Sequence, residues 1–226
     1  NMKIYDSILK TCPLFVHIEA EELENMLQCL NTKVRKISKN QAIFMEGDPA
    51  DFVGIVLKGA VQITRQDYYG NRSIVATVGE GELFGETFAC AGVEKMPVSV
   101  HATVDSEVML INCKKILKTC RNACPFHRIL VENLLSIVAR KNLYLNQKME
   151  ILAKRSTKEK LMAYLLQEAR RQGKDAFVIP YDRQGLADYL GVERSAMSAE
   201  ISKMRKEGIL ECHRSYFRLI EKHSYQ

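Results

Sequence analysis

The spacing of apolar residues changes character twice along the chain. Up to about residue 30 they recur every three or four positions, as in a helix, and Pro13 interrupts the first helical segment. From about Val34 to Asn112 short apolar runs alternate with turn residues, which is typical of many short strands. From about Pro125 the spacing becomes helical again and stays so to about residue 152. The pattern predicts an α+β protein.

Turn residues and alternation support the strand assignment in the middle of the chain. Lys58-Gly59 and Gly70-Asn71 lie between apolar runs and predict hairpins. Alternate residues of the later segment are apolar, which predicts a strand with one buried face: Val98, Val100, Ala102 and Val104. Short strands at such regular intervals indicate a small antiparallel barrel or sandwich.

The long helix carries a heptad pattern, which we name the seam. A narrow apolar seam needs a partner helix, and the simplest partner is a second copy of the chain in a parallel homodimer. Asn142, in the middle, is expected to set the register at some expense of stability. The alternative is that the seam packs on the strand domain of its own chain. The seam consists of Val131, Leu135, Val138, Asn142, Leu145, Met149 and Leu152.

The C-terminal third contains the signals of two short helices followed by a hairpin. Asp182 is a good N-cap for the first helix, and Gly191 allows a sharp turn after it. A second helix is expected from about Arg194 to Lys206, and Gly208 ends it. A hairpin of Ile209-Leu210 and Tyr216–Leu219 follows, so the segment predicts a winged helix-turn-helix.

The second of these helices has unusually short side chains on its polar side. Met197, Ile201 and Met204 are spaced to face the core. Short residues on the other side would let the backbone enter a DNA major groove, and Arg194 could pair with a guanine edge. Lys206 and Arg214 are expected to flank the phosphates. The candidate DNA-binding residues are Arg183, Gln184, Arg194, Ser195, Ser198, Ala199, Ser202, Lys203 and Arg205.

Charge favours the same end of the chain. The net charge is +6, of which residues 1–153 contribute +1 (18 basic, 17 acidic) and residues 154–226 contribute +5 (15 basic, 10 acidic). A basic module suggests a polyanion partner such as double-stranded DNA, although it could also be a solubilising surface. No apolar run is long enough to span a membrane, and seven cysteines without a C-x-x-C pair fit reduced thiols, so we expect a cytoplasmic protein.

The order of these parts resembles the cyclic-AMP receptor protein/FNR (Crp/Fnr) family of bacterial transcription regulators. "KNQAIFMEGDPADFVGIVLKGAVQI" and "GEGELFGETF" are similar to the family's cyclic-nucleotide-binding-type β-roll, a double-stranded β-helix or jelly roll, and "DRQGLADYLGVERSAMSAEISKMRKEGIL" to its DNA-binding segment. The resemblance implies an effector-sensing domain (1–124), a dimerisation helix (125–153) and a winged helix (154–226). It also implies a near-palindromic DNA site, a small-molecule effector and RNA polymerase as a possible partner.

The resemblance also identifies a candidate effector pocket. In cyclic-nucleotide-binding members a glycine-rich turn into a short helix receives the phosphate, and here that cassette is "GELFGETFACAG", with Gly85, Glu86 and Thr87. Glu86 matches the ribose-binding glutamate, or could be a structural cap. The positions of the phosphate-binding arginine and its hydroxyl neighbour hold Met96 and Pro97, which cannot bind a phosphate. We therefore predict an effector other than cyclic AMP, unless a shifted alignment supplies Lys95 instead.

Two alternatives concern the signal and the partner. Cys113, Cys120 and Cys124 could make a redox- or metal-responsive regulator, although buried apolar cysteines are the simpler interpretation. The winged helix could also dock onto proteins rather than DNA. No enzyme motif occurs, so we expect no catalytic residue, no metal and no cofactor.

Overall fold

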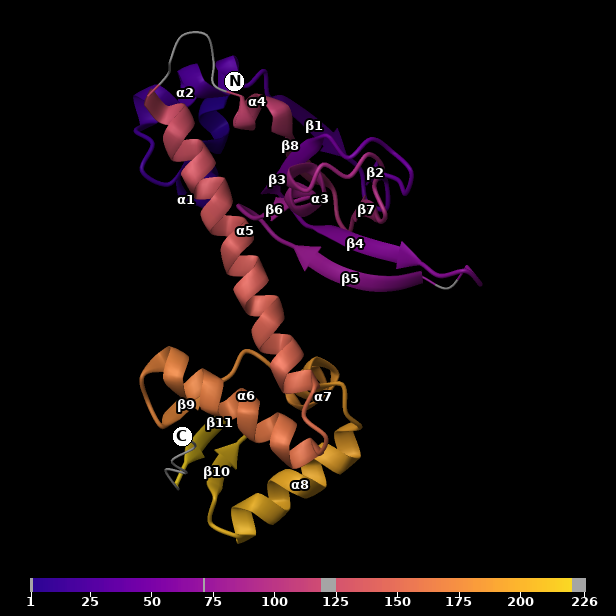
Figure 1. Ribbon diagram of the computed structural model, residues 1–226, viewed down its shortest axis with the longest axis vertical. Coiled ribbons are helices and arrows are strands. Elements are labelled where there is room, and N and C mark those ends of the chain that lie inside the picture. Colours follow the sequence, from indigo (N-terminus) through magenta and orange to yellow (C-terminus); the bar gives the residue numbers. More distant parts are fainter. Residues whose placement is uncertain (1, 71, 119–124, 221–226) are drawn as a thin grey trace. The chain divides into compact units, whose positions relative to one another are not determined.

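The chain is described here from a computed structural model, in which residues 2–70, 72–118 and 125–220 are described. Across the described residues the chain forms two compact units, Asn1–Arg140 and Lys141–Gln226. The division falls within the long helix α5 (Pro125–Leu152), so the last turns of this helix belong to the second unit (Figure 1). The α+β architecture predicted from the sequence is confirmed. The three predicted domain ranges stay a prediction.

The N-terminal segment is helical, as its apolar spacing predicts. Pro13 separates two parts of it, because proline is tolerated at the start of a helix but not inside one. Leu23, Met26 and Leu27 form the buried face of the last helix. The elements are η1 (Met2–Tyr5), α1 (Asp6–Thr11), η2 (Pro13–Phe15) and α2 (Ala20–Cys29).

The strands of the first unit form a roll of two antiparallel sheets across the described residues. One sheet has the strand order β1-β8-β3-β6 and the other β2-β7-β4-β5. Figure 1 shows β4 and β5 as the long hairpin at one edge of the roll. The bounds are β1 (Lys33–Ile37), β2 (Ala42–Phe44), β3 (Phe52–Lys58), β4 (Val61–Gln66), β5 (Arg72–Val78), β6 (Leu83–Phe84), α3 (Glu86–Cys90), β7 (Ser99–Ala102), β8 (Ser106–Asn112) and α4 (Cys113–Leu117).

Apolar side chains from both sheets fill the inside of the roll. Val56 and Val108 of one sheet and Val100 of the other belong to a single buried cluster. The prediction that Val104 shares the buried face is wrong, because it is exposed. The strand ends at Ala102, and the chain bends over residues 103–105 before β8, so Val104 does not continue the alternation of the strand.

The first half of α5 packs on the helices and the first sheet of its own unit. Leu130 and Leu134 are buried there, and Ile137 packs against the same cluster. The Asn133 side-chain amide donates to the carbonyls of Leu14 and Val16, at 3.0 and 2.7 Å. These contacts fix α5 to the N-terminal helices.

The second unit is a helical domain with a small sheet of order β10-β11-β9 among its described residues. Neighbouring residues set the limits of α6, the first helix that lies wholly in this unit. Ser156 and Glu159 form a capping box before α6, and Gly173 ends this helix in the left-handed conformation. The elements after α5 are α6 (Thr157–Gln172), β9 (Ala176–Val178), α7 (Arg183–Leu190), α8 (Arg194–Lys206), β10 (Leu210–His213) and β11 (Tyr216–Leu219).

Candidate functional site

The helix-turn-helix is built from α7 and α8 by two local signals. The Asp182 carboxylate accepts a hydrogen bond of 2.7 Å from the Gly185 N–H, which satisfies one of the free donors at the start of α7. Gly191 ends α7 with a φ of +61°, a conformation that glycine adopts without the strain other residues incur. The chain therefore turns sharply into α8.

The core side of α8 is the predicted one. Met197, Ile201 and Met204 are buried in the centre of the second unit. At about 100° per residue, the direction opposite to these three side chains passes close to Ser195, Ala199 and Lys206, within roughly 30°. We name these three residues, with Ser202 and Lys203 at about 50° on either side, the outward face of α8.

The outward face differs from the predicted one in its centre. Lys206, which the sequence suggested only as a flanking cation, lies near the middle of it. Arg194, Ser198 and Arg205 lie roughly 90–130° away from the middle, at the edges next to the buried stripe. Ser198 is accordingly half-buried, and its carbonyl accepts the hydroxyl of Ser202 at 3.0 Å. The same positions of Lys206 and Arg194 around the helix follow from the sequence, if each residue is placed at 100° intervals relative to the buried methionines.

Two predicted contacts of α7 have partners within the protein. The guanidinium of Arg183 lies over the ring of Phe217, 5.1 Å from its centroid, and an Nη atom is 3.3 Å from the sulfur of Cys212. The Gln184 amide donates to Asp188 at 2.8 Å. Arg183 therefore joins α7 to the β10–β11 hairpin, and its predicted role at DNA stays a prediction.

The hairpin β10–β11 has the form of a wing. Its turn contains Arg214 with a φ of +52°, and the guanidinium of Arg218 lies 3.5 Å from the carboxylate of Glu211 across the two strands. Tyr216 pairs with Val178, so β9 completes the sheet. A cation at the tip of a wing can reach a polyanion beside the helix-turn-helix.

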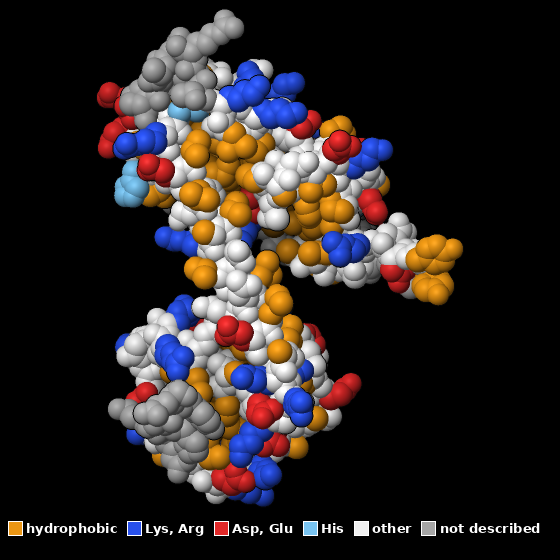
Figure 2. Space-filling view, viewed as in Figure 1, with side chains coloured by type: hydrophobic (Ala, Val, Ile, Leu, Met, Phe, Trp, Pro, Cys, Tyr) orange, Lys and Arg blue, Asp and Glu red, His pale blue; other side chains and the backbone are white. Residues whose placement is uncertain are grey.

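Most of the seam of α5 is exposed. Leu135 retains 68% of its accessible surface and Met149 66%, whereas Val131 and Val138 are half-buried. Figure 2 shows hydrophobic side chains on the exposed middle part of α5. Packing on the chain's own roll is carried by the neighbouring stripe that includes Leu134, about 100° around the helix from the first part of the seam.

The candidate effector cassette forms the predicted turn and short helix. Gly85 has a φ of +77°, and a Cβ atom there would meet the carbonyl oxygen of Phe52 at 3.0 Å. Glu86 is the first residue of α3 and is buried, so it is not the N-cap residue itself. The hydroxyl of Thr87 donates to its carboxylate at 3.3 Å. Both side chains are thus held at the start of α3.

The predicted phosphate position is filled by an apolar side chain. Met96 is 2% exposed and belongs to the core of the roll. Its N–H donates to the carbonyl of Asp48 and its carbonyl accepts from the N–H of Gly47, at 2.7 and 2.9 Å. Pro97 has no N–H to offer. Lys95, the residue suggested by a shifted alignment, is exposed and lies in a β-bridge with Pro49.

Each of the two units contains a region that matches a known domain family. Residues 34–123 match the family of cyclic nucleotide-binding domains, and residues 159–223 match the Crp-like helix-turn-helix domain. The chain belongs to the Crp/Fnr family of transcription regulators.

Two relatives of this Crp/Fnr chain each share about a quarter of its residues over the aligned region. It is 24% identical over 207 residues to the transcriptional activator protein FnrL of Cereibacter sphaeroides, covering 85% of this chain and 77% of FnrL. It is also 24% identical to the cyclic AMP receptor protein of Thermus thermophilus, covering 89% of each chain. The solved structure of the c-di-GMP responsive global regulator CLP of Xanthomonas campestris has a TM-score of 0.56 at 18% identity, covering 90% of this chain and 100% of CLP. The last likeness concerns the fold alone.

Of the three cysteines in the predicted group, only Cys113 lies within the described residues of the Crp/Fnr chain. Cys113 is buried at the start of α4, and its sulfur lies 3.8 Å from that of Cys90, a residue that the sequence did not pair with it. Cys120 and Cys124 lie outside the described residues. Among the residues that are described, no group of three or more His, Cys, Asp or Glu could hold a metal ion.

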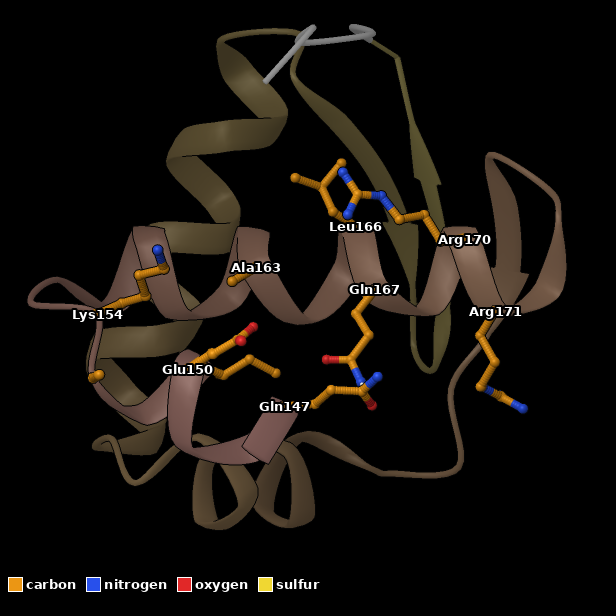
Figure 3. Close-up of a pocket in the computed structure, with 10 residues that line it drawn as sticks. Gln147, Glu150, Lys154, Ala163, Leu166, Gln167, Arg170 and Arg171 are labelled. Atoms are coloured by element: carbon orange, nitrogen blue, oxygen red, sulfur yellow. The ribbon is translucent and has the colours of Figure 1, made fainter. Parts of the chain in front are cut away.

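A hollow of about 820 Å³ lies in the second unit of the Crp/Fnr chain, between the end of α5 and α6. Figure 3 shows Gln147 and Gln167 meeting in it, where the amide of Gln167 donates to Gln147 at 2.7 Å. The side chains of Glu150, Lys154 and Arg170 surround these two glutamines. The residues that line the hollow come from the end of α5, the residues after it and α6, and none lies on α8, so we assign the hollow no role in DNA binding. No described helix is long and apolar enough to cross a membrane.

Proposed function

We propose that the chain is a dimeric, cytoplasmic regulator that binds a near-palindromic site in double-stranded DNA and responds to an effector other than cyclic AMP. The outward face of α8 carries the DNA-binding part of this proposal. Ser195, Ala199 and Ser202 are short and exposed, with Lys203 and Lys206 beside them. A helix without such short side chains would be held further from the bases.

The dimensions of α8 suit the major groove of DNA. A helix with ordinary side chains is about 10–12 Å wide, and the groove is about 12 Å wide. Small residues on the outward face remove the bulk that would hold the backbone away from the base edges. Arg194 lies at the edge of the outward face, but it is the first residue of α8, and from that end of the helix its long side chain can extend to a guanine bidentately. Lys206, at the other end of the helix, can meet a phosphate. The excess charge of residues 154–226 adds a general attraction to the duplex.

Selection from random DNA with the purified chain tests the proposal and also yields the preferred site. On that site, Arg194→Ala is expected to weaken binding by about 1–3 kcal/mol, roughly 5- to 150-fold, and to relax one base position in each half-site. Lys174→Ala is the matched control, because Lys174 is an exposed cation in the loop after α6, away from α8. It removes the same charge and is expected to leave the base preference unchanged.

Two results would contradict DNA binding. If Arg194→Ala and Lys174→Ala weaken binding equally and neither changes the selected sequence, the attraction is only electrostatic. If the purified chain selects no sequence at low salt, in the presence or absence of a metabolite panel, the winged helix serves a protein partner instead.

Dimerisation is supported by the exposed seam. Apolar side chains that remain in water at heptad spacing are stabilised by a second helix of the same pattern, and Asn142 can pair with its copy. Two reading helices would then address half-sites about 34 Å apart, one turn of DNA. Sedimentation should give twice the chain mass of 25.8 kDa. A monomer at micromolar concentration would exclude the seam as a dimer interface.

The proposed exclusion of cyclic AMP depends on Met96. A cyclic phosphate at this position would meet a buried thioether and a proline instead of a cation and a hydroxyl. A hydrogen bond to a charged group contributes about 1.5–3 kcal/mol, so losing two weakens binding on the order of a hundredfold or more. Calorimetric titration with cyclic AMP is expected to show no micromolar site. A relative is named for cyclic AMP reception, and a micromolar constant here would place this chain with it.

A further inference from the structure

Two cysteines from distant parts of the sequence meet beside the candidate effector cassette. Cys90 is the last residue of α3 and Cys113 the first residue of α4. Their sulfur atoms lie 3.8 Å apart, close enough for one thiol to hydrogen-bond to the other. A disulfide has an S–S distance of about 2.0 Å, so the two sulfurs are neighbours that would have to move closer for a bond to form.

The two thiols differ in exposure and acidity. Cys113 is 2% exposed in a buried cluster with side chains of α4 and α5. The hydrogen bond with Cys90 raises the pKa of the Cys113 thiol, and burial raises it further. Cys90 is half-buried, and the hydrogen bond from the Cys113 thiol lowers its pKa, against the opposing effects of burial and of the Glu86 carboxylate. Cys90 is therefore the better nucleophile of the pair, because the thiolate is the reactive form and an oxidant can reach it.

We propose that Cys90 and Cys113 form a redox-active dithiol, which a peroxide converts to an intramolecular disulfide. The sulfur of Cys90 attacks one peroxide oxygen, the O–O bond breaks, and with hydrogen peroxide the products are a sulfenic acid and water. The Cys113 sulfur then attacks the sulfur of the sulfenic acid, and the S–O bond breaks as a second water leaves. In sum two thiols lose two electrons and two protons, and the peroxide is reduced to two waters. A thiol reductant reverses the change by exchange.

The disulfide would connect two elements that already lie in contact. It would tie the end of α3, whose first residue is Glu86, to the start of α4. The cassette would then be covalently fixed to the element that precedes α5 in the chain. This inference is independent of the proposed DNA binding, because its chemistry takes place wholly within the first unit.

The test uses the full chain and does not involve DNA. The reduced protein is treated with a small excess of hydrogen peroxide, its remaining thiols are alkylated after denaturation, and peptides are mapped by mass spectrometry. We expect one linked peptide pair, containing Cys90 and Cys113, and the loss of two of the seven thiols. Dithiothreitol should restore both. Cys29, which is exposed and has no described cysteine partner, is the internal control for general oxidation.

Variants assign the order of the two steps. Cys113→Ala should accumulate a sulfenic acid at Cys90 that dimedone traps, whereas Cys90→Ala should leave Cys113 alkylatable at the same peroxide dose. Thermal melting of both variants checks that they fold, and the mapping of the unmodified chain remains decisive if one does not. The proposal is overturned if Cys90 and Cys113 remain reduced when Cys29 is oxidised, or if peroxide links either of them to another cysteine instead.

Discussion

The strongest test of the proposed dimer replaces a single leucine of the seam. Leu145 is 56% exposed on α5, and Leu143, two residues before it, is 61% exposed. At about 100° per residue, Leu143 lies roughly 130° around the helix from the nearby seam residues. Both residues are leucines, both lie in α5, and their exposed fractions are nearly the same. Only their direction differs, so Leu143→Ala is a matched control for Leu145→Ala.

The expected effect follows from the surface that dimerisation would cover. Burying a whole leucine side chain contributes about 1.5–3 kcal/mol, and roughly half of the Leu145 surface is available to be buried. Both copies lose the contact, so the loss for each dimer is about 1.5–3 kcal/mol. The dimer dissociation constant should therefore rise roughly 10- to 150-fold for Leu145→Ala.

Sedimentation equilibrium or mass photometry over a dilution series measures this constant directly. Leu143 points away from the seam, so Leu143→Ala should change the dissociation constant by less than about threefold. A threefold change corresponds to about 0.7 kcal/mol. Equal shifts of the dissociation constant for the two variants would refute the assignment of the seam. Dimerisation would then depend on the amount of apolar surface on α5 and not on the side of the helix where it lies. A monomeric parent chain would refute it outright.

Further predictions concern the local structure that holds the two units. Asp182→Ala removes the cap of α7 and should reduce the free energy of unfolding of the second unit by about 0.5–2 kcal/mol in urea titration. Arg183→Ala removes the contact with the Phe217 ring and should lower the stability of the same unit by roughly 0.5–2 kcal/mol. Gly54→Ala should destabilise the roll by about 1–3 kcal/mol or more, because the new methyl carbon would lie 2.1 Å from the buried Phe84 ring.

Each of these variants has a result that contradicts its explanation. Asp182→Asn, which keeps a capping oxygen, should retain most of the stability, and an equal loss would show that the carboxylate acts in another way. Unchanged urea unfolding in Arg183→Ala would mean that the contact with Phe217 contributes nothing. An unaltered melting temperature in Gly54→Ala would require the Phe84 ring to move without cost, contrary to its burial.

The elements that were predicted well are those specified by neighbouring residues. The limits of α8 and the cap at Asp182 depend on signals within a few positions, and the structure confirms both. The burial of Met197, Ile201 and Met204 follows from helical spacing alone, and it too is confirmed. The error at Val104 arises because alternation continues in the sequence beyond the end of the strand, where the chain bends before β8.

Features that depend on packing between distant segments were not predictable from one sequence. Cys90 and Cys113 are 23 residues apart, and only the closing of the roll brings α3 against α4. Met96 could be recognised as unable to bind phosphate, but not as part of the apolar core, because that depends on the other sheet. Arg183 looked like a phosphate contact, and its position over Phe217 requires the wing to fold back onto α7.

The two apolar stripes of α5 explain why the heptad pattern alone was ambiguous. Leu130 and Leu134 satisfy the helix's own unit, so the pattern that includes Leu135 is not needed for folding of that unit. An isolated chain would keep the second stripe in water, where exposed apolar surface at heptad spacing favours association. In the proposed dimer, α5 packs on its own roll with one stripe and on the second copy with the other. A change in the roll that shifts α5 would therefore also shift the dimer interface. The same helix would then link effector binding to the pairing of the two DNA-binding units.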